Sequence, residues 1–174
     1  MKRNTPSIAR IRELLAYDPD TGVLTWRHSN SMRAARNTRF AGKVAFARMH
    51  TQGYRNGCID GISLYAHRVA WALYFGEWPD GEIDHINHDH ADNRICNLRS
   101  VTRAENLRNL PKMRHNTSGV TGVYRRKDKW LAAIRVDRKL IRLGYFHSFN
   151  DAVAARELAE RQYRFHPNHG RNAA

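Results

Sequence analysis

The sequence predicts an α+β protein made of two modules, and two patterns carry this prediction. In the middle of the chain, two hydrophobic runs flank the turn pair Asp60-Gly61 and lead into an aromatic helix. Nearer the C-terminus, three short strands precede an Ala-rich helix in the order βββα. A length of 174 residues suits two small domains, and the 41% of hydrophobic residues is enough for packed cores.

The first 49 residues are predicted to hold a helix, a turn and a short strand. Residues 18–22 (DPDTG) read as a turn, and residues 23–26 as a strand. Residues 29–39 are polar and rich in arginine, which predicts a loop or a frayed helix. This segment either lies along a phosphate backbone or is a mobile part of the surface. The helix is predicted from apolar residues at helical spacing, namely Ile8, Ile11, Leu14 and Leu15.

The middle of the chain is predicted to contain a hairpin followed by helices. Strands at 53–59 and 62–65 flank the Asp60-Gly61 turn, and a helix over 67–75 ends at Gly76. A second helix is predicted over 102–110. Its Thr102 and Glu105 have the spacing of a capping box.

The last module is predicted to be a three-stranded sheet with one helix. The strands are expected at 120–124, 130–136 and 140–146, and Ser148 and Asp151 begin the helix. Alternation along the second strand places Trp130 on one face and Arg135 on the other.

The charge balance points to a polyanionic partner. The formal net charge is +14, arginine outnumbers lysine 24 to 6, and the pI is about 10.6. Arginine is the better residue for bidentate contacts with phosphates and guanine edges. Residues 111–174 carry +9 of the excess. With a mean hydropathy of −0.71 and no run of 18 apolar residues, we expect no transmembrane helix and a cytosolic protein.

Carboxylate, imidazole and amide side chains gather between residues 84 and 106. Asp84 precedes His85. Asn97 comes 12 residues after His85, and Asn106 comes 9 residues after Asn97. Carboxylate and amide oxygens suit Mg²⁺ or Mn²⁺, and a neighbouring imidazole can accept a proton from a water that attacks phosphorus. On a nucleic-acid-binding protein this set indicates a phosphodiesterase.

Several spaced elements here resemble the His-Asn-His (HNH) endonucleases, whose nuclease module has the ββα-metal fold. The matching segments are 65–71, 76–79, 83–87, 92–94 and 97–99, with Thr102 and Asn106. The resemblance implies a nuclease domain over 50–110, after an N-terminal region over 1–49. It is closest in kind to members from phages and homing elements.

The resemblance also implies roles for individual residues. His85 would be the general base, Asp84 and Asn106 the ligands of the divalent metal, and Asn97 the residue that holds the loop and His85 in place. Asn106 stands where the family name has its last histidine, and His88 stands where the family usually has glycine.

Two other histidine interpretations stay open at this stage. His85, His88 and His90 are spaced closely enough for a zinc cluster, although paired cysteines are absent. Cys58 and Cys96 are instead expected to be buried as small hydrophobic residues. For His67 a packed or capping role is favoured over a catalytic one.

Residues 118–166 resemble the DNA-binding domain of plant ethylene-response-factor (Apetala-type) transcription factors, which also occurs fused to phage homing endonucleases. The matching segments are 121–123, 129–134 and 143–146, with the Ala-rich helix from Asp151. The resemblance implies DNA contacts by Arg126, Arg135 and Arg142. Trp130 is also predicted to contact DNA, while it packs partly in the core. Residues 111–117 would be a linker and 167–174 a tail.

Together these features predict a metal-dependent DNA endonuclease of the homing type that nicks or cuts double-stranded DNA. We expect a divalent metal, Mg²⁺ or Mn²⁺, and a monomer without a membrane partner or a small-molecule cofactor. Two alternatives remain: a DNA-binding regulator with an inactive nuclease motif, and a zinc-stabilised protein that binds RNA or DNA.

Overall fold

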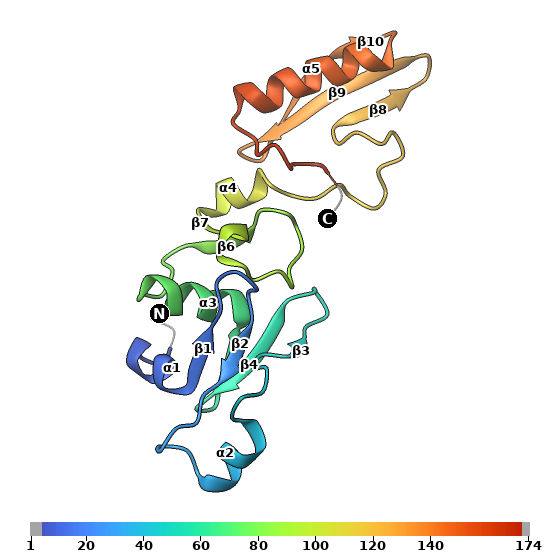
Figure 1. The fold of residues 1–174 in the computed structure, drawn as a ribbon. Helices are drawn as coiled ribbons and strands as arrows, with labels where there is room; N and C mark the ends of the chain where they lie inside the picture. Colours follow the sequence, from blue (N-terminus) through green and yellow to red (C-terminus); the bar gives the residue numbers. More distant parts are fainter. Residues whose placement is uncertain (1–4, 172–174) are drawn as a thin grey trace. The chain divides into compact units, whose positions relative to one another are not determined.

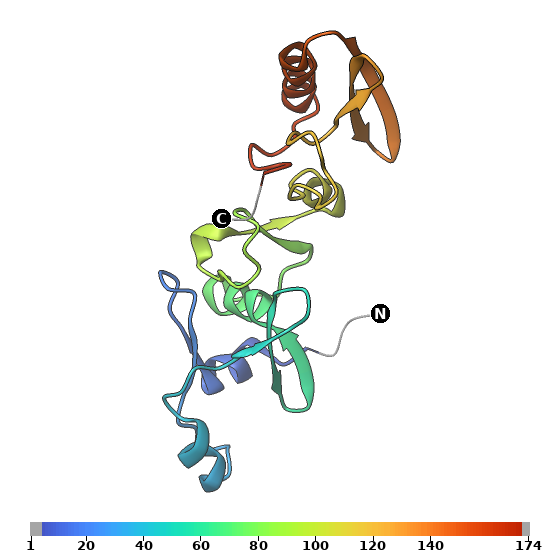
Figure 2. The ribbon, with the colours of Figure 1, turned by 90° about the vertical axis from the view of Figure 1, so that its right-hand side faces the viewer.

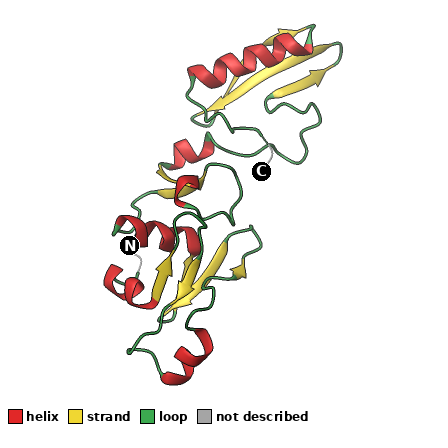
Figure 3. Cartoon of the chain, in the orientation of Figure 1, coloured by secondary structure: helices red, strands yellow, loops and turns green. Residues whose placement is uncertain are grey.

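The computed structural model describes residues 5–171, and these form two compact units (Figures 1 and 3). Unit 1 covers Met1–Val101 and unit 2 covers Thr102–Ala174. The division therefore falls nine residues before the polar stretch at 111–117 that was predicted as the linker between the modules. The mixed α+β class is as predicted, with four small antiparallel sheets in the described residues.

Unit 1 begins with a helix and a small hairpin. Helix α1 (Ile8–Leu14) starts at Ser7, whose side chain accepts a hydrogen bond from the Arg10 backbone N–H. The predicted helix is thus present, but Leu15 is extended and begins a strand that the sequence analysis missed. This strand, β1 (Leu15–Tyr17), pairs with β2 (Leu24–Trp26) across the expected turn.

The next helix lies in the arginine-rich stretch. Helix α2 (Ala34–Phe40) is seven residues long, so of the two predicted conformations, a loop or a frayed helix, the helix is present over this part of the segment. Buried Asn37 stabilises this conformation. Its Nδ2 donates to the Ser29 carbonyl at 2.7 Å, and its Oδ1 accepts from the Ser29 N–H at 3.1 Å.

A three-stranded sheet and a helix follow. Strands β3 (Arg48–Met49), β4 (Arg55–Ile59) and β5 (Ile62–Tyr65) lie in that order. The predicted turn joins β4 to β5, and both of its residues have positive φ, 48° at Asp60 and 80° at Gly61. Helix α3 (Ala66–Phe75) ends at Gly76, which adopts the left-handed conformation as expected.

One core joins the N-terminal elements to this sheet and helix. Ile11 and Leu14 of α1, Leu24 of β2, Ile59 of β4 and Val69 of α3 are almost fully buried in the same cluster. The predicted N-terminal region over 1–49 therefore shares its core with residues of the predicted nuclease domain.

Two short strands complete unit 1. Strand β6 (Glu82–His85) pairs with β7 (Leu98–Val101), and the register places Asp84 opposite Arg99. A single 3-10 turn, η1 (Ile95–Asn97), leads into β7. Ile83 and Leu98 pack with Ala70 of α3 in a second small core, which fixes β6 and β7 against that helix.

Unit 2 begins with α4 (Arg103–Leu107), directly after β7 in the chain. The capping box is present, because the Thr102 side chain accepts from the Glu105 N–H while the Glu105 carboxylate accepts from the Thr102 N–H. The helix is shorter than the predicted 102–110. It closes with hydrogen bonds of the i→i−3 type, from the Arg108 N–H to the Glu105 carbonyl at 2.9 Å and from the Asn109 N–H to the Asn106 carbonyl at 3.0 Å.

The rest of unit 2 is the predicted βββα arrangement (Figure 2). Strands β8 (Val123–Arg126), β9 (Lys129–Val136) and β10 (Lys139–Phe146) form the sheet with β9 in the centre. Helix α5 (Phe149–Gln162) packs on it, with Ser148 as its N-cap. The first strand starts three residues later than predicted, because Gly122 has φ 81°, which is not a strand conformation. Gly122 also lies so close to β9 that a Cβ there would be 2.4 Å from the Ala133 carbonyl oxygen.

Two further expectations can be compared with the structure. Cys58 and Cys96 are exposed free thiols rather than buried hydrophobic residues, so that prediction is wrong. Within residues 5–171, no helix is both long enough and apolar enough to cross a bilayer.

Candidate active site

Asp84 is a buried carboxylate at the end of β6. Only 7% of its surface is exposed. Arg99, its cross-strand neighbour, donates from Nε and Nη2 to Oδ2 of Asp84 at 2.9 and 2.7 Å. Burying a carboxylate without hydrogen-bond partners is costly, so the two bonds from Arg99 offset part of that cost and also fix the orientation of the group.

His85 follows Asp84 and is the more deeply buried of the two, with 3% of its surface exposed. Burial lowers the pKa of His85 below its ordinary value, and His90 lowers it further, while the Asn93 contact and the Asp84 carboxylate act in the opposite direction. His85 is therefore neutral at pH 7. A neutral imidazole beside a carboxylate can accept a proton, which a charged imidazolium cannot do.

Asn93 was not assigned a role by the sequence analysis, yet it contacts the His85 ring. Its Oδ1 lies 3.5 Å from Nε2 of His85, while its Nδ2 donates to the Ala91 carbonyl at 3.1 Å. The Ala91 contact orients the amide so that its oxygen faces His85. When Nε2 carries the proton, it points to this oxygen and Nδ1 is the basic nitrogen.

Aromatic and imidazole rings surround His85. Tyr54, the residue before β4, lies 5.8 Å from it between ring centres, and His67 from α3 lies 5.1 Å away and edge-on. His67 stacks on Tyr65 and is 93% buried, and burial lowers its pKa to about 3. His67 is thus a packed, neutral histidine, as the sequence analysis favoured. It helps to form a rigid wall behind His85.

Asn97 lies in η1 and is 5% exposed. Its Oδ1 accepts from the Asn87 N–H at 3.0 Å, and its Nδ2 donates to the Asp92 carbonyl at 2.9 Å. Its backbone carbonyl accepts from the Ile86 N–H at 2.9 Å. Asn97 therefore bridges both sides of the loop that follows His85. That it also holds the His85 ring in place stays a prediction.

The N-terminal turn supports the same loop, a contact that the sequence analysis did not foresee. The Tyr17 hydroxyl donates to the Asn93 carbonyl at 2.8 Å, and the Pro19 carbonyl accepts from the Ile95 N–H at 3.1 Å. A Cβ on Gly22 would lie 2.5 Å from the Arg94 backbone nitrogen. The turn signal was visible in the sequence, but nothing in it named residues 93–95 as the partner.

The contacts of His88 and His90 bear on the zinc interpretation. His90 engages both of its nitrogens: Nδ1 lies 2.7 Å from the Gln52 carbonyl, and Nε2 lies 3.3 Å from the Tyr54 hydroxyl. A zinc ion bound to His90 would have to displace one of these contacts. His88 has φ 66°, a conformation that glycine adopts without strain, in keeping with the glycine usual at this position in the family.

The predicted metal ligands lie in different units. Asp84 belongs to unit 1, and Asn106 belongs to α4 of unit 2, where its backbone N–H donates to the Thr102 carbonyl. Over residues 5–171, no group of three or more His, Cys, Asp and Glu side chains has a metal-binding arrangement. A hard cation that takes one carboxylate and completes its shell with water and phosphate oxygens does not require such a group. Asp84 fits that kind of ion.

The outer face of the unit 2 sheet, opposite α5, carries the predicted arginines. The strand register places Arg142 beside Ala133, and Leu140 beside Arg135. Arg126 lies opposite Lys129 in the strand register. Arg126, Arg135 and Arg142 are all exposed. All three arginines thus share the outer face.

Trp130 lies on the other face of the sheet. Its ring is 4.7 Å from Phe149 of α5, and the Arg125 guanidinium lies 5.1 Å above it. This position suits packing against the helix rather than contact with a ligand on the outer face.

Comparison with known proteins supports the nuclease interpretation. Residues 64–108 match the family model of the HNH endonucleases. The matched segment includes Asp84, His85, Asn97 and Asn106, and it covers about a quarter of the chain. The match indicates a nuclease and implies DNA as its substrate. No curated protein and no solved structure matched the chain.

Proposed function

We propose that the protein is a metal-dependent DNA endonuclease in which His85 activates the attacking water. The observation that carries this proposal is the buried, neutral His85 next to the Asp84 carboxylate, within the segment that matches the HNH family. The loop contacts of Asn97 and Asn93 support it, because they hold the imidazole in one orientation.

Each residue then has a defined part in hydrolysis. His85 takes the proton from water as the water oxygen attacks phosphorus, and Asp84 would hold the divalent ion. A bound Mg²⁺ or Mn²⁺ would stabilise the charge on the departing 3′ oxygen. The proposal also includes Asn106 as the second metal ligand, a role as a homing endonuclease and a location in the cytoplasm.

The test compares three variants on supercoiled plasmid. His85→Ala should lower the cleavage rate by about 10²- to 10⁴-fold, the usual contribution of a general base. Asp84→Asn and Asn106→Ala should raise the Mg²⁺ concentration needed for half-maximal rate. Arg161→Ala, an exposed change on α5, is the control and should cut at the wild-type rate. Equal rates for all four proteins and wild type would refute the proposal.

Sites on the outer face of the unit 2 sheet would hold the enzyme on its target. This part of the proposal rests on the exposed Arg126, Arg135 and Arg142, which share one face of a sheet. Strands bearing arginine can enter the major groove and read guanine edges.

A further inference from the structure

A long stretch of unit 1 contains no acidic residue. Residues 21–59 hold seven basic side chains and neither Asp nor Glu: Arg27, Arg33, Arg36, Arg39, Lys43, Arg48 and Arg55. None of the seven takes part in an ion pair within the part of the chain that the structure describes. We call this stretch the basic arm. Within the described residues, its basic side chains therefore carry their charge without an ion-pair partner.

The part of the basic arm around α2 presents its arginines on a firm support. Arg33, Arg36 and Arg39 follow one another every three residues and are exposed. The Arg36 guanidinium lies 5.7 Å from the centre of the Trp26 ring, and the Arg39 guanidinium lies 5.3 Å from that of Phe40. Such stacking limits the freedom of the side chains while their N–H groups stay available.

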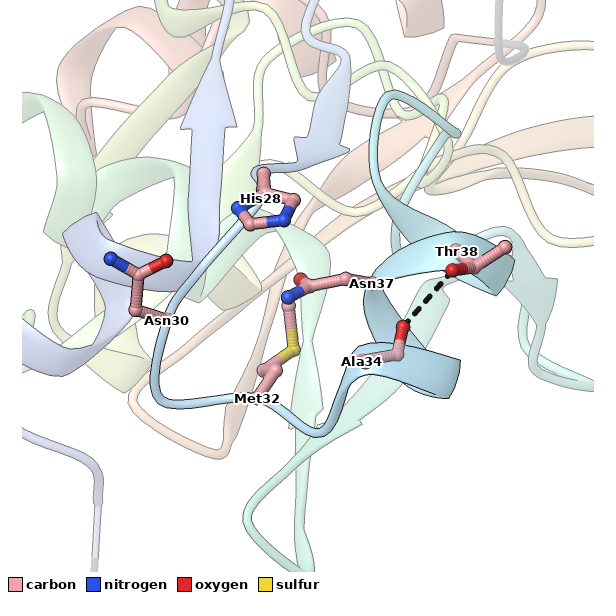
Figure 4. A pocket seen from close by; sticks show the side chains of 6 residues that line it. All are labelled: His28, Asn30, Met32, Ala34, Asn37 and Thr38. Atoms are coloured by element: carbon pink, nitrogen blue, oxygen red, sulfur yellow. Dashed lines mark hydrogen bonds between the residues drawn. The ribbon is translucent and has the colours of Figure 1, made fainter.

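The backbone beneath these arginines is also held in place. Asn37 points from α2 toward the preceding loop beside His28 and Met32 (Figure 4). It bonds both backbone groups of Ser29, and Ser29 Oγ in turn contacts the Glu13 carboxylate. Ser29 and Arg10 thus engage Glu13, so this acidic side chain near the arm is already partnered.

The basic arm leads from α2 to the candidate active site. Arg48 and Arg55 lie on β3 and β4, and the turn between those strands reaches the His85 loop. There the Gln52 carbonyl contacts His90 at 2.7 Å, and the Tyr54 ring lies beside His85. In Figure 1, α2 lies at the end of unit 1 away from β6, with β3 and β4 between them.

We propose that the basic arm binds the phosphate backbone of duplex DNA to one side of the bond that is cut. The inference rests on the proposed nuclease function for its choice of partner. The arginines of the arm form no ion pair within the described residues, and they are exposed as far as Arg48 and half-buried at Arg55. A series of this kind that leads to the proposed phosphodiesterase site fits the regular phosphates of one duplex. In this proposal unit 1 has a DNA-binding surface of its own, in addition to the outer face of the sheet in unit 2.

The test measures DNA binding without cleavage, in full-length protein that carries His85→Ala. Affinity for a random-sequence 30-base-pair duplex is measured by fluorescence anisotropy over a range of salt concentrations. With Arg33→Ala, Arg36→Ala and Arg39→Ala combined, the slope of log K against log salt should fall by up to about three units. Affinity near 0.1 M salt should fall on the order of 10²-fold.

Two matched variants guard against a change in folding. The triple change of the same arginines to lysine keeps the charge and should retain most of the salt slope. Arg33→Ala with Arg48→Ala removes two exposed side chains that stack on no ring, and it should lower the slope by up to about two units. Unchanged slope and affinity in both alanine variants would overturn the proposal.

Further measurements on the same proteins distinguish duplex DNA from other partners. They also test the basic arm separately from the nuclease proposal. If the alanine variants lose binding to single-stranded RNA or to acidic lipid vesicles but keep duplex binding, DNA is the wrong partner and the inference fails. Cleavage by wild type is scored separately. Weakened duplex binding without any wild-type cleavage would refute only the nuclease, and normal binding with cleavage would refute only the basic arm.

Discussion

His67 shows how a single residue in the wall around His85 affects the stability of the fold. Its imidazole is 93% buried, and its pKa is about 3 because burial disfavours the charged form. The charges of His85, Arg68 and His90 act in the same direction. In the unfolded chain the same group titrates near its ordinary pKa of about 6.5.

This difference predicts a loss of stability in acid. Below pH 6.5 the unfolded state binds a proton that the folded state does not take up until about pH 3, so stability falls as the pH drops through this window. Between pH 7 and pH 5 the loss due to His67 is about 2 kcal/mol.

Urea denaturation at the two pH values measures this loss. His67→Gln should weaken the pH dependence by that amount, whereas His115→Gln, a change at an exposed histidine, should not alter it. The same pH dependence in both variants would show that His67 titrates normally in the folded protein.

Among the elements, the turn between β1 and β2 has a supporting role that its position in the chain does not reveal. It contacts the loop at residues 93–95 through Tyr17 and Pro19, and Asn93 in that loop faces His85. Gly22 is the point of closest approach, with φ 73° and backbone atoms of residues 93 and 94 within about 3 Å of a Cβ site.

Gly22→Ala should therefore both destabilise the protein and slow cleavage. Gly42→Ala is the matched control, because Gly42 has a similar φ of 76° but open space around it. The left-handed conformation costs each variant about 1–2 kcal/mol. Only Gly22→Ala also displaces the loop. Thermal unfolding and plasmid cleavage measure the two effects, and equal cleavage by both variants would contradict the supporting role.

The unit 2 sheet makes a separate prediction at the same scale. Arg135→Ala and Arg142→Ala should each weaken DNA binding and lower its salt slope by about one unit, since each removes a phosphate contact. Arg161→Ala on α5 should leave the slope unchanged. Titrations at several salt concentrations decide this. If the slope and site preference stay constant in both sheet variants, the outer face does not bind DNA.

Over the whole molecule, local signals in the sequence predicted most elements but not their partners. The Asp60-Gly61 turn, the Gly76 helix end and the Thr102 capping box were recognised because a few neighbouring residues determine each of them. Strand β1 was missed because its apolar residues continue the helical spacing of α1. Only its pairing with β2 makes it extended.

The candidate site divides in the same way. Asp84 and His85 were found from a spaced pattern of residue types, and both are buried at the end of one strand. Asn93, Tyr54 and the Gly22 turn were not found, because they meet His85 or its loop only through tertiary packing. The formal net charge of +14 does not belong to one segment, because the basic arm is part of unit 1 and the arginine-bearing sheet is part of unit 2.

In the proposed reaction, His85 is the general base of metal-dependent DNA hydrolysis. The most direct measurement is the conversion of supercoiled plasmid to nicked or linear form by wild type and His85→Ala, each with Mg²⁺ and with EDTA. We predict conversion by wild type in Mg²⁺ alone, and a rate at least about 10²-fold lower for His85→Ala. Equal conversion by the two proteins in Mg²⁺, or conversion by wild type in EDTA, would contradict the claim.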